Sequence, residues 1–319
     1  MIDTIILQNL TTKNTLEMGK SFGHKYIIED NGIDWGDVEA VHNRYTNLTG
    51  IGNIITSTKL DTRRVSITGR VCPTHTIKQI SQMYDVYTAK EIEEKRFEEI
   101  KDAEKPLSQL INPLHYIRIR LGNYYIDGKP TTSIQYSHKE KENNEIYCKF
   151  TFTLDCSDPM FHFKTVLETQ LSGLVGGFHF PVIIPKNEGM HFGNLIRYQL
   201  IAVQNMGDVD IGALIRIVAK GEVVNPRISS VYGEEEIVVN KTLHAGEIVE
   251  IDTNERTIVG YHSQGSAGEN DFSYWDFDNS WIQFTVGANL IGYSADDDTQ
   301  NAMDITIRTN PSFFAVEGQ

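Results

Sequence analysis

Short stretches in which apolar and polar residues alternate recur along most of the chain. Val65 and Ile67 alternate with Ser66 and Thr68, and residues 116–121 repeat this period of two. Such a period is typical of strands that bury one face. The same alternation marks residues 148–154, 214–224, 236–240, 247–252, 281–286 and 304–309. Turn signals such as Asn-Gly and His-Ala-Gly separate these stretches, so the sequence predicts a mainly β protein built from antiparallel sandwiches.

One stretch, residues 88–106, has the pattern of a helix instead. Thr88 and Glu91 have the spacing of a capping box, which begins a helix by satisfying free backbone N–H groups. The apolar residues predicted to share one face are Ile92, Phe97, Ile100 and Ala103. Pro106 is expected to stop this helix or to begin another.

The length of 319 residues indicates about two domains. Residues 154–163 hold a candidate boundary, because a predicted strand ends there and Asp158-Pro159 marks a turn. The charge balance changes just after it: residues 151–319 carry 9 Lys+Arg and 23 Asp+Glu, and the first half is neutral. We therefore predict an N-terminal β domain over 1–157, with a helical segment at about 76–110, and a second β domain over 158–319.

Composition and charge disfavour several classes of protein. The acidic surplus argues against nucleic acid or an anionic membrane as a partner of the second half, because phosphate binding needs a positive surface. No run approaches the ~18–20 apolar residues that span a bilayer, and the N-terminus has no pattern of a secretion signal. Three cysteines, with no C-x-x-C, indicate reduced thiols and folding in a reducing cytoplasm.

Three acidic residues raise the question of catalysis. Glu250, Asp252 and Glu255 have the E-x-D-x-x-E spacing of laminarinase-type glycosidases, whose two catalytic carboxyls need about 5–5.5 Å between them. That chemistry requires one strand to continue through all three. The residues Asp-Thr-Asn are typical of turns, however, because Asp and Asn side chains form hydrogen bonds with their own backbone. We therefore interpret residues 247–252 as a strand, 252–255 as a hairpin turn and 256–261 as the return strand.

Other patterns are weaker. Ser266 has no nucleophile-elbow motif, and Gly50-Ile-Gly52 lacks the third glycine of a dinucleotide loop. The aspartates at 276–278 and 296–298 lack the EF-hand pattern, and no paired-histidine zinc motif occurs. His162 and His179 each lie between two phenylalanines in the sequence, and we interpret them as half-buried residues packed against aromatic rings. Trp275, Phe277 and Trp281 fit core positions better than a sugar platform. We predict no catalytic, cofactor-binding or metal-binding residue.

The order of several short motifs resembles the distal tail protein family of long-tailed phages. The first half contributes residues 60–71, similar to that family's "R-x-[IV]-x-[IL]-x-G-x-[IV]" strand, and 152–161, similar to its "C-x-D-P-x-F" junction. The second half contributes, in order, residues 176–185, 203–210, 217–228, 241–253, 273–297 and 305–317. These resemble "N-x-G-D", "G-x-x-x-N-P-x-I", "L-x-x-G-E-x-[IV]-x-I-D-T" and "G-x-N-x-I" patterns, and together they cover nearly the whole chain.

The resemblance implies a structural component and not an enzyme. It implies an N-terminal β domain with a helix that forms a homo-hexameric ring, followed by a galectin-like jelly roll. The ring would join the tail tube to the hub and anchor receptor-binding or baseplate proteins at the tip of the virion tail, after assembly in the host cytoplasm. The resemblance implies no cofactor, no specific nucleic-acid binding and no membrane insertion. A carbohydrate-binding sandwich that recognises the host cell wall is the alternative, and a glycosidase is the third possibility.

Overall fold

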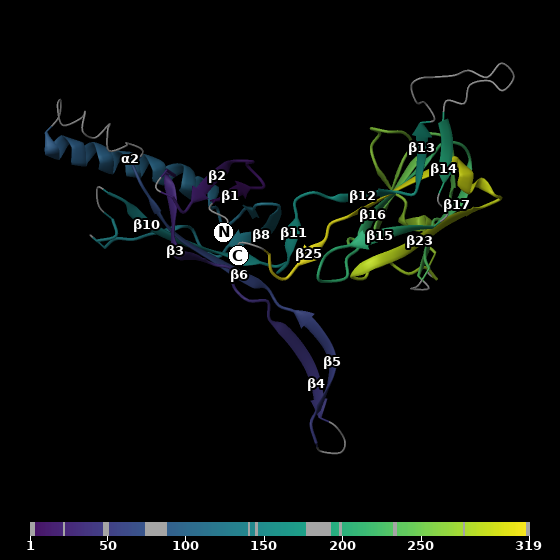
Figure 1. Cartoon of the computed structure of the whole chain (residues 1–319), viewed down its shortest axis with the longest axis horizontal. Coiled ribbons are helices and arrows are strands. Elements are labelled where there is room, and N and C mark those ends of the chain that lie inside the picture. The colour runs from purple at the N-terminus through teal and green to yellow at the C-terminus, as the bar shows by residue number, and fades with distance from the viewer. Residues whose placement is uncertain are drawn as a thin grey trace. The chain divides into compact units, whose positions relative to one another are not determined.

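The computed structural model describes residues 4–21, 23–46, 51–73, 88–139, 141–143, 146–176, 193–197, 200–231, 235–276 and 278–316. The chain forms two compact units. The first unit comprises Met1–Lys164 and Phe314–Gln319, and the second unit comprises Thr165–Phe313. The second unit is thus an insertion near the C-terminal end of the first. The predicted mainly β fold is confirmed (Figure 1).

The first unit is built on one large sheet, in which neighbours follow the order β11-β8-β7-β1-β2-β3-β6-β10-β9. Its strands are β1 (Thr4–Asn9), β2 (Thr15–Gly19), β3 (Tyr26–Asp34), β6 (Arg63–Val71), β7 (Ile117–Leu121), β8 (Tyr124–Pro130), β9 (Gln135–Tyr136), β10 (Cys148–Cys156) and β11 (Phe161–Phe163). Pairing is antiparallel except between β2 and β3. Buried residues of β6 and β10 alternate with half-buried ones, and in β6 with the exposed Arg64, as their period of two predicts.

Helix α2 (Ala89–Leu110) contacts β2 and β6. Its predicted capping box is present: the Glu91 N–H donates to Thr88 Oγ1, and the Thr88 N–H donates to Glu91 Oε2. Residues 76–87 of the predicted helical segment lie outside the described residues. Ile92, Ile100 and Ala103 are buried as expected, but Phe97 is exposed, with the Lys101 Nζ 5.2 Å from its ring centroid.

The expected stop at Pro106 is wrong, because α2 continues through it to Leu110. Leu107 and Leu110 are buried beyond the proline, so packing holds the last turn in place. The Tyr26 hydroxyl donates to the Ala103 carbonyl at 2.8 Å. The Tyr136 hydroxyl donates to the Glu104 carbonyl at 2.9 Å. These two bonds fasten the turn around Pro106 to the sheet, so the helix continues although the proline removes one of its hydrogen bonds.

A cluster of charges lies on the other face of the large sheet. The Glu29 carboxylate accepts a hydrogen bond from Arg70 Nε at 2.9 Å and lies 3.0 Å from Lys149 Nζ. Burial alone would raise the pKa of Glu29, but the two cations outweigh it and hold the pKa below its ordinary value. A carboxyl whose pKa is lower in the folded state stabilises the fold at any pH above its pKa in the unfolded state. This stabilisation is lost as the pH falls through its pKa in the folded state.

We expect Glu29→Gln to lower the free energy of unfolding at pH 7 by about 1 kcal/mol. The difference from the parent protein narrows as the pH falls through the lowered pKa of Glu29, because the parent then loses its charged carboxylate too. Urea unfolding at several pH values measures this, with the exposed Glu39→Gln as the control. A difference that stays constant down to pH 3 would contradict the assigned role of the Glu29 charge.

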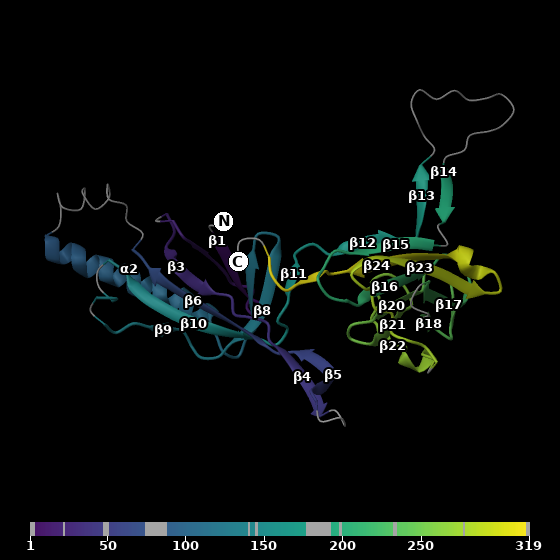
Figure 2. The same ribbon diagram turned by 60° about the horizontal axis from the view of Figure 1, so that its bottom comes forward.

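The second unit is a sandwich of two sheets. One sheet follows the order β12 (Leu167–Gln170), β24 (Met303–Thr309), β16 (Ala213–Ala219), β20 (Ile248–Asp252), β21 (Thr257–Tyr261) and β22 (Glu269–Asn270). The other follows β15 (Leu200–Asn205), β23 (Gly287–Asp296), β17 (Val223–Ser230) and β18 (Glu236–Val238), with β19 (Thr242–Leu243) beside β17. Ile217 and Ile251 of the first sheet share one buried cluster with Ile228 and Ile291 of the second, so the two sheets enclose a common core (Figure 2).

Smaller elements complete the second unit. They are the two-stranded β13 (Ser172–Gly176) and β14 (Gly193–Arg197), the 3-10 turns η1 (Phe272–Tyr274) and η2 (Thr299–Ala302), and the short β25 (Ser312–Phe313). Residues 177–192, which hold most of the motif at 176–185 and include His179, lie outside the described residues.

Two predicted strands differ from the structure. Residues 214–224 are divided between β16 and β17, because Lys220–Glu222 form the turn between them. Residues 281–286 contribute one isolated bridge, Ile211↔Phe284, and no strand. Side chains replace a neighbouring strand here: the backbone N–H of Gln283 donates to Glu235 Oε2, and that of Thr285 donates to Asn289 Oδ1. The alternation at 281–286 therefore reflects the burial of Ile282 and Phe284, and these residues do not form a strand of a sheet.

Candidate functional site

The acidic triplet lies on a hairpin, as the turn interpretation predicts. β20 ends at Asp252 and β21 begins at Thr257, with Asp252↔Thr257 as the last pair. Asp252 Oδ1 accepts hydrogen bonds from the N–H groups of Asn254 and Glu255, at 2.9 and 3.0 Å. Arg256 takes the left-handed conformation that closes the turn, with φ of 56°. Glu255 thus lies beyond the end of the strand, and the three carboxylates do not share one strand.

The remaining polar groups of this hairpin stabilise the fold. Glu250 accepts from Arg216 Nη1 at 2.9 Å and from the Tyr261 hydroxyl at 3.1 Å. Thr253 Oγ1 accepts from the Ala213 N–H at 2.8 Å, which fixes the turn to the first residue of β16. Each of these groups has a structural partner, and the arrangement offers no acid–base pair across an open cleft.

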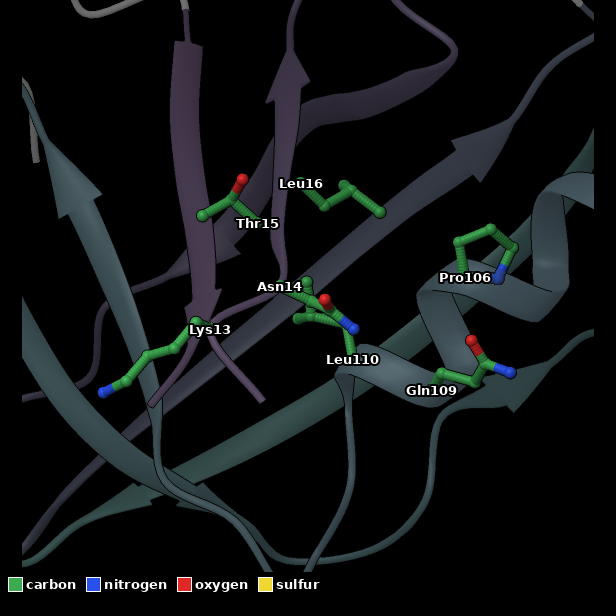
Figure 3. Close-up of a pocket in the computed structure, with 7 residues that line it drawn as sticks. All are labelled: Lys13, Asn14, Thr15, Leu16, Pro106, Gln109 and Leu110. Carbon is green, nitrogen blue, oxygen red and sulfur yellow. The ribbon is translucent and has the colours of Figure 1, made fainter. Parts of the chain in front are cut away.

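An open pocket of about 400 Å³ lies between the turn after β1 and the C-terminal end of α2 (Figure 3). The buried Asn9 holds its two sides together: its Nδ2 donates to the Leu110 carbonyl and its Oδ1 accepts from the N–H of Thr11 and of Thr12. The lining residues are Lys13, Asn14, Thr15, Leu16, Pro106, Gln109 and Leu110. None of these seven is a carboxylate, imidazole or thiol, and the one ionisable side chain among them is the amine of Lys13.

The aromatic stretch at 272–281 packs on itself. The rings of Trp275 and Trp281 stack with centroids 4.0 Å apart, and both side chains pack against the core of the second unit. Phe272 and Tyr274 are exposed. Phe277 lies outside the described residues. A sugar platform needs open ring faces, and these two tryptophans cover each other, so the geometry favours the predicted core role.

Two aspartates of the calcium-like stretches, Asp276 and Asp296, have protein partners. Asp296 lies 2.9 Å from Arg227 Nη2 and accepts from Asn225 Nδ2. Asp276 Oδ1 accepts from the Asp278 N–H. Across the described ranges, no three or more His, Cys, Asp or Glu side chains are grouped to hold a metal. No helix in the same ranges is long and apolar enough to cross a membrane.

The cysteines and His162 also have structural surroundings. All three cysteines are free thiols, as predicted, and Cys148 and Cys156 are buried. Burial raises the pKa of each of these two thiols to about 12, which keeps them protonated and unreactive. His162 lies over Tyr125, with ring centroids 5.3 Å apart, and its Nε2 lies 2.9 Å from Asp158 Oδ2.

The "N-x-G-D" motif at 205–208 is a buried polar network. Asn205 is 1% exposed, and its Nδ2 donates to the carbonyls of Val209 and Phe284 at 2.8 and 2.9 Å. Its Oδ1 accepts from the Gly207 N–H at 2.9 Å. A Cβ at Gly207 would lie 2.6 Å from the Ser312 carbonyl oxygen, so only glycine fits. Hydrogen bonding explains the Asn position of the motif, and close packing explains its Gly position.

The two motifs of the first unit meet in its core. Arg63, the first residue of the "R-x-[IV]" strand, places its guanidinium 4.7 Å from the ring centroid of Phe161, the last residue of the "C-x-D-P-x-F" junction. The strand's glycine, Gly69, leaves room for a ring, since a Cβ there would lie 2.7 Å from Phe150 Cζ. These motif residues are therefore also explained by packing.

The sequence patterns missed a projecting hairpin, which we call the arm: β4 (Ala40–Thr46) and β5 (Asn53–Leu60), of the first unit (Figure 1). Every residue of both strands is exposed. Tyr45 and Ile54 form a cross-strand pair that is 52% and 42% exposed, and Ile55, on the opposite face, is 52% exposed. Gly52 of the rejected dinucleotide loop lies between these strands, with φ of 75°. Large exposed apolar residues on both faces mark the arm as the candidate functional surface.

A solved phage structure shares this fold. The structure described as "Crystal Structure of SPP1 Dit (gp 19.1) Protein, a Paradigm of Hub Adsorption Apparatus in Gram-positive Infecting Phages" aligns over 96% of this chain and 98% of that chain, at 10% identity and a TM-score of 0.58. "Structure of the Phage P2 Baseplate in its Activated Conformation with Ca" aligns over 97% and 98%, at 12% identity and a TM-score of 0.44. No curated protein matches the sequence.

The second unit also matches a sequence family. Residues 206–310 match the family model SPP1_Dit, described as "Siphovirus-type tail component, C-terminal domain". The match covers about a third of the chain, and it supports a structural component of a phage tail or baseplate. The second unit of the chain carries the C-terminal domain of the siphovirus-type tail components, so the resemblance to distal tail proteins found in the motifs is confirmed.

Proposed function

We propose that this chain assembles into a homo-hexameric ring at the distal end of a tail tube, joins the tube to the hub, and anchors the host-recognition apparatus. Its role is mechanical and involves no catalysis. The arm is the observation that carries the self-association step. The ring geometry and the number six come from the resemblance to distal tail proteins.

A two-stranded hairpin is marginally stable in water when it has no further partner. Among the described residues, β4 and β5 pair only with each other. Tyr45 and Ile54 on one face and Ile55 on the other expose apolar surface that a neighbouring copy would bury. An arm that docks on a different surface of the next copy makes a heterologous contact, and such contacts close into rings when the rotation per copy is right.

The charges of the chain are compatible with this assembly. The described arm residues include two cations, Arg44 and Lys59, and no carboxylate. The second unit carries most of the chain's acidic surplus. Copies of the second unit would therefore repel each other, and the contacts of the ring fall to the neutral first unit and its arm. In this proposal the second unit is a galectin-like jelly roll, available to hub, receptor-binding or baseplate partners of the virion.

The mass of the purified protein in native mass spectrometry tests the proposal. We expect a species of six chains, either for the protein alone or after addition of its hub partner, and a sixfold ring in electron micrographs. A chain that remains monomeric with its hub partner, or that forms an open filament or a dimer, would refute the ring. Turnover of β-glucan by the purified protein would refute the mechanical role.

A further inference from the structure

A pair of aromatic side chains lies exposed at η1 of the second unit. Phe272 is 41% exposed and Tyr274 is 38% exposed, and we call this pair the aromatic patch. The Phe272 ring is nearly parallel to the rings of Trp275 and Trp281, with interplanar angles of 11° and 20° and centroids 6.2 and 6.4 Å away. Both tryptophans pack against the core of the unit. Phe272 is therefore supported from below by rings that belong to the core.

Several hydrogen bonds hold the backbone of the aromatic patch in place. The Phe272 N–H donates to Asn270 Oδ1 at 3.0 Å, and the Tyr274 N–H donates to the Asp271 carbonyl at 3.0 Å. Asp271 is itself 5% exposed, and its Oδ2 accepts from Lys241 Nζ at 2.7 Å. A surface that is ordered before it meets a partner loses little conformational entropy on binding, so this patch is suited to recognition.

The chain around the aromatic patch carries little positive charge. The sequence has no Lys or Arg between Arg256 and Arg308. Lys241 Nζ lies 5.1 Å from the centroid of the Tyr274 ring, but Asp271 balances its charge at 2.7 Å. A cation of a partner would therefore meet little repulsion at this point of the surface.

Carboxylates border the aromatic patch. Asp276 and Asp278 follow it directly in the sequence, and Asp278 is exposed. The exposed Glu236 lies beside the same stretch, because its carbonyl oxygen accepts from the Ser280 N–H at 3.0 Å. A guanidinium or ammonium group is attracted both by carboxylates and by the faces of aromatic rings. Exposed rings with a negative border are therefore complementary to a ligand that is both cationic and apolar.

We propose that the aromatic patch is a docking surface for a polypeptide segment of a partner protein that carries arginine or lysine beside apolar side chains. Such a segment supplies both the positive charge and the apolar contact that the patch lacks. A neutral sugar has no charge to match the carboxylates, and nucleic acid would be repelled by them. The inference concerns the second unit alone and does not depend on ring formation or on the arm.

Selection from a displayed library of random short peptides, with the full chain as bait, tests the proposal without the natural partner. We expect the enriched peptides to carry Arg or Lys next to apolar residues. A purified peptide from this selection should bind the double variant Phe272→Ala, Tyr274→Ala at least about tenfold more weakly than the parent, because exposed aromatic anchors dominate such contacts. Phe97 of α2 is also 41% exposed, so Phe97→Ala is the matched control and should bind like the parent.

Neutralising the border gives a second readout that leaves the rings in place. Glu236→Gln together with Asp278→Asn should weaken binding of the same peptide at low salt and remove most of the difference between low and high salt. The same two amide changes at the exposed Glu39 and Asp30 of the first unit are the control and should have no such effect. Native mass spectrometry should show every variant in the assembly state of the parent, so that loss of the patch and loss of the ring are separate results.

The proposal is overturned by a selection that enriches no peptide, by enriched peptides without Arg or Lys, or by undiminished binding to the aromatic double variant. A glycan array covers the other class of ligand. A glycan that binds the parent and Phe97→Ala, but not the aromatic double variant, would assign the patch to sugar and would overturn the proposal as well. We expect no glycan to show this pattern.

Discussion

Placing aspartate at Tyr45, Ile54 and Ile55 is expected to abolish assembly and leave a folded monomer. All three side chains are exposed in the single chain, so the substitutions should change its free energy of unfolding by no more than about 0.5 kcal/mol each. In the proposed ring they become buried, where an unpaired carboxylate costs several kcal/mol. Because each 1.4 kcal/mol is a factor of ten, association should weaken by more than about a thousandfold.

The second unit offers a matched control for this variant. Leu200, Val231 and Val286 have similar exposures of 52%, 46% and 54%. The same three aspartates at these positions add the same charge away from the arm, and assembly should persist. Native mass spectrometry gives the assembly state, and thermal unfolding verifies the fold. An arm variant that still assembles, or a control that fails as completely as the arm variant, would show that the arm does not hold the copies together.

The sequence predicts the sheet-forming stretches well where one face of a strand is buried. β6 and β10 carry strict alternation because the sheet separates a packed face from a polar one. The same signal misleads at 281–286, where Ile282 and Phe284 are buried but side chains of Glu235 and Asn289 hold the backbone in place of a strand. Alternation indicates which side chains are buried, but it does not indicate which groups form hydrogen bonds with the backbone between them.

The arm escapes prediction for the opposite reason. Its two strands bury neither face in the single chain, so no period separates an inner from an outer set of residues. In the proposed ring its apolar side chains contact a second copy, and the sequence of one chain carries no sign of that contact. The continuation of α2 past Pro106 escapes for a related reason, because the packing of Leu107 and Leu110 comes from tertiary contacts and overrides a local helix breaker.

Motif residues that resemble a functional site in the sequence have structural roles in the fold. The acidic triplet looked catalytic by spacing, yet Glu250 pairs with Arg216 and Asp252 caps its own turn. Asn and Asp side chains form hydrogen bonds with nearby backbone, and Gly allows the backbone to bend sharply. These residue types are therefore frequent both in turns and in active sites. Motif order identified the family, while the role of each motif residue required its hydrogen-bond partners. Arg63 is the clearest case, because its exposure and its distant partner Phe314 cannot be read from its neighbours in sequence.

Asn205→Leu is expected to cause the largest loss of stability in the second unit. Leucine has nearly the same size but makes none of the three hydrogen bonds of Asn205, which leaves the Gly207 N–H and the carbonyls of Val209 and Phe284 without that partner. The Phe284 carbonyl keeps the Ile211 N–H as a donor, so two groups become unsatisfied. Each buried unsatisfied group costs about 1–3 kcal/mol, so we expect a loss of about 3–5 kcal/mol. At about 2–4 °C per kcal/mol for a unit of this size, the Tm of the second unit should fall by roughly 10 °C or more.

The adjacent Gln204 provides the control for the Asn205 network. Gln204 is exposed on the same strand, so Gln204→Leu makes the same change from amide to leucine outside the core and should shift stability by less than about 0.5 kcal/mol. Differential scanning calorimetry measures both variants. Because the network lies wholly within the second unit, any separate unfolding transition of the first unit should keep its temperature. Equal small effects at the two positions would show that Asn205 is retained for a reason other than its hydrogen bonds, and the physical account of the "N-x-G-D" motif would then be wrong.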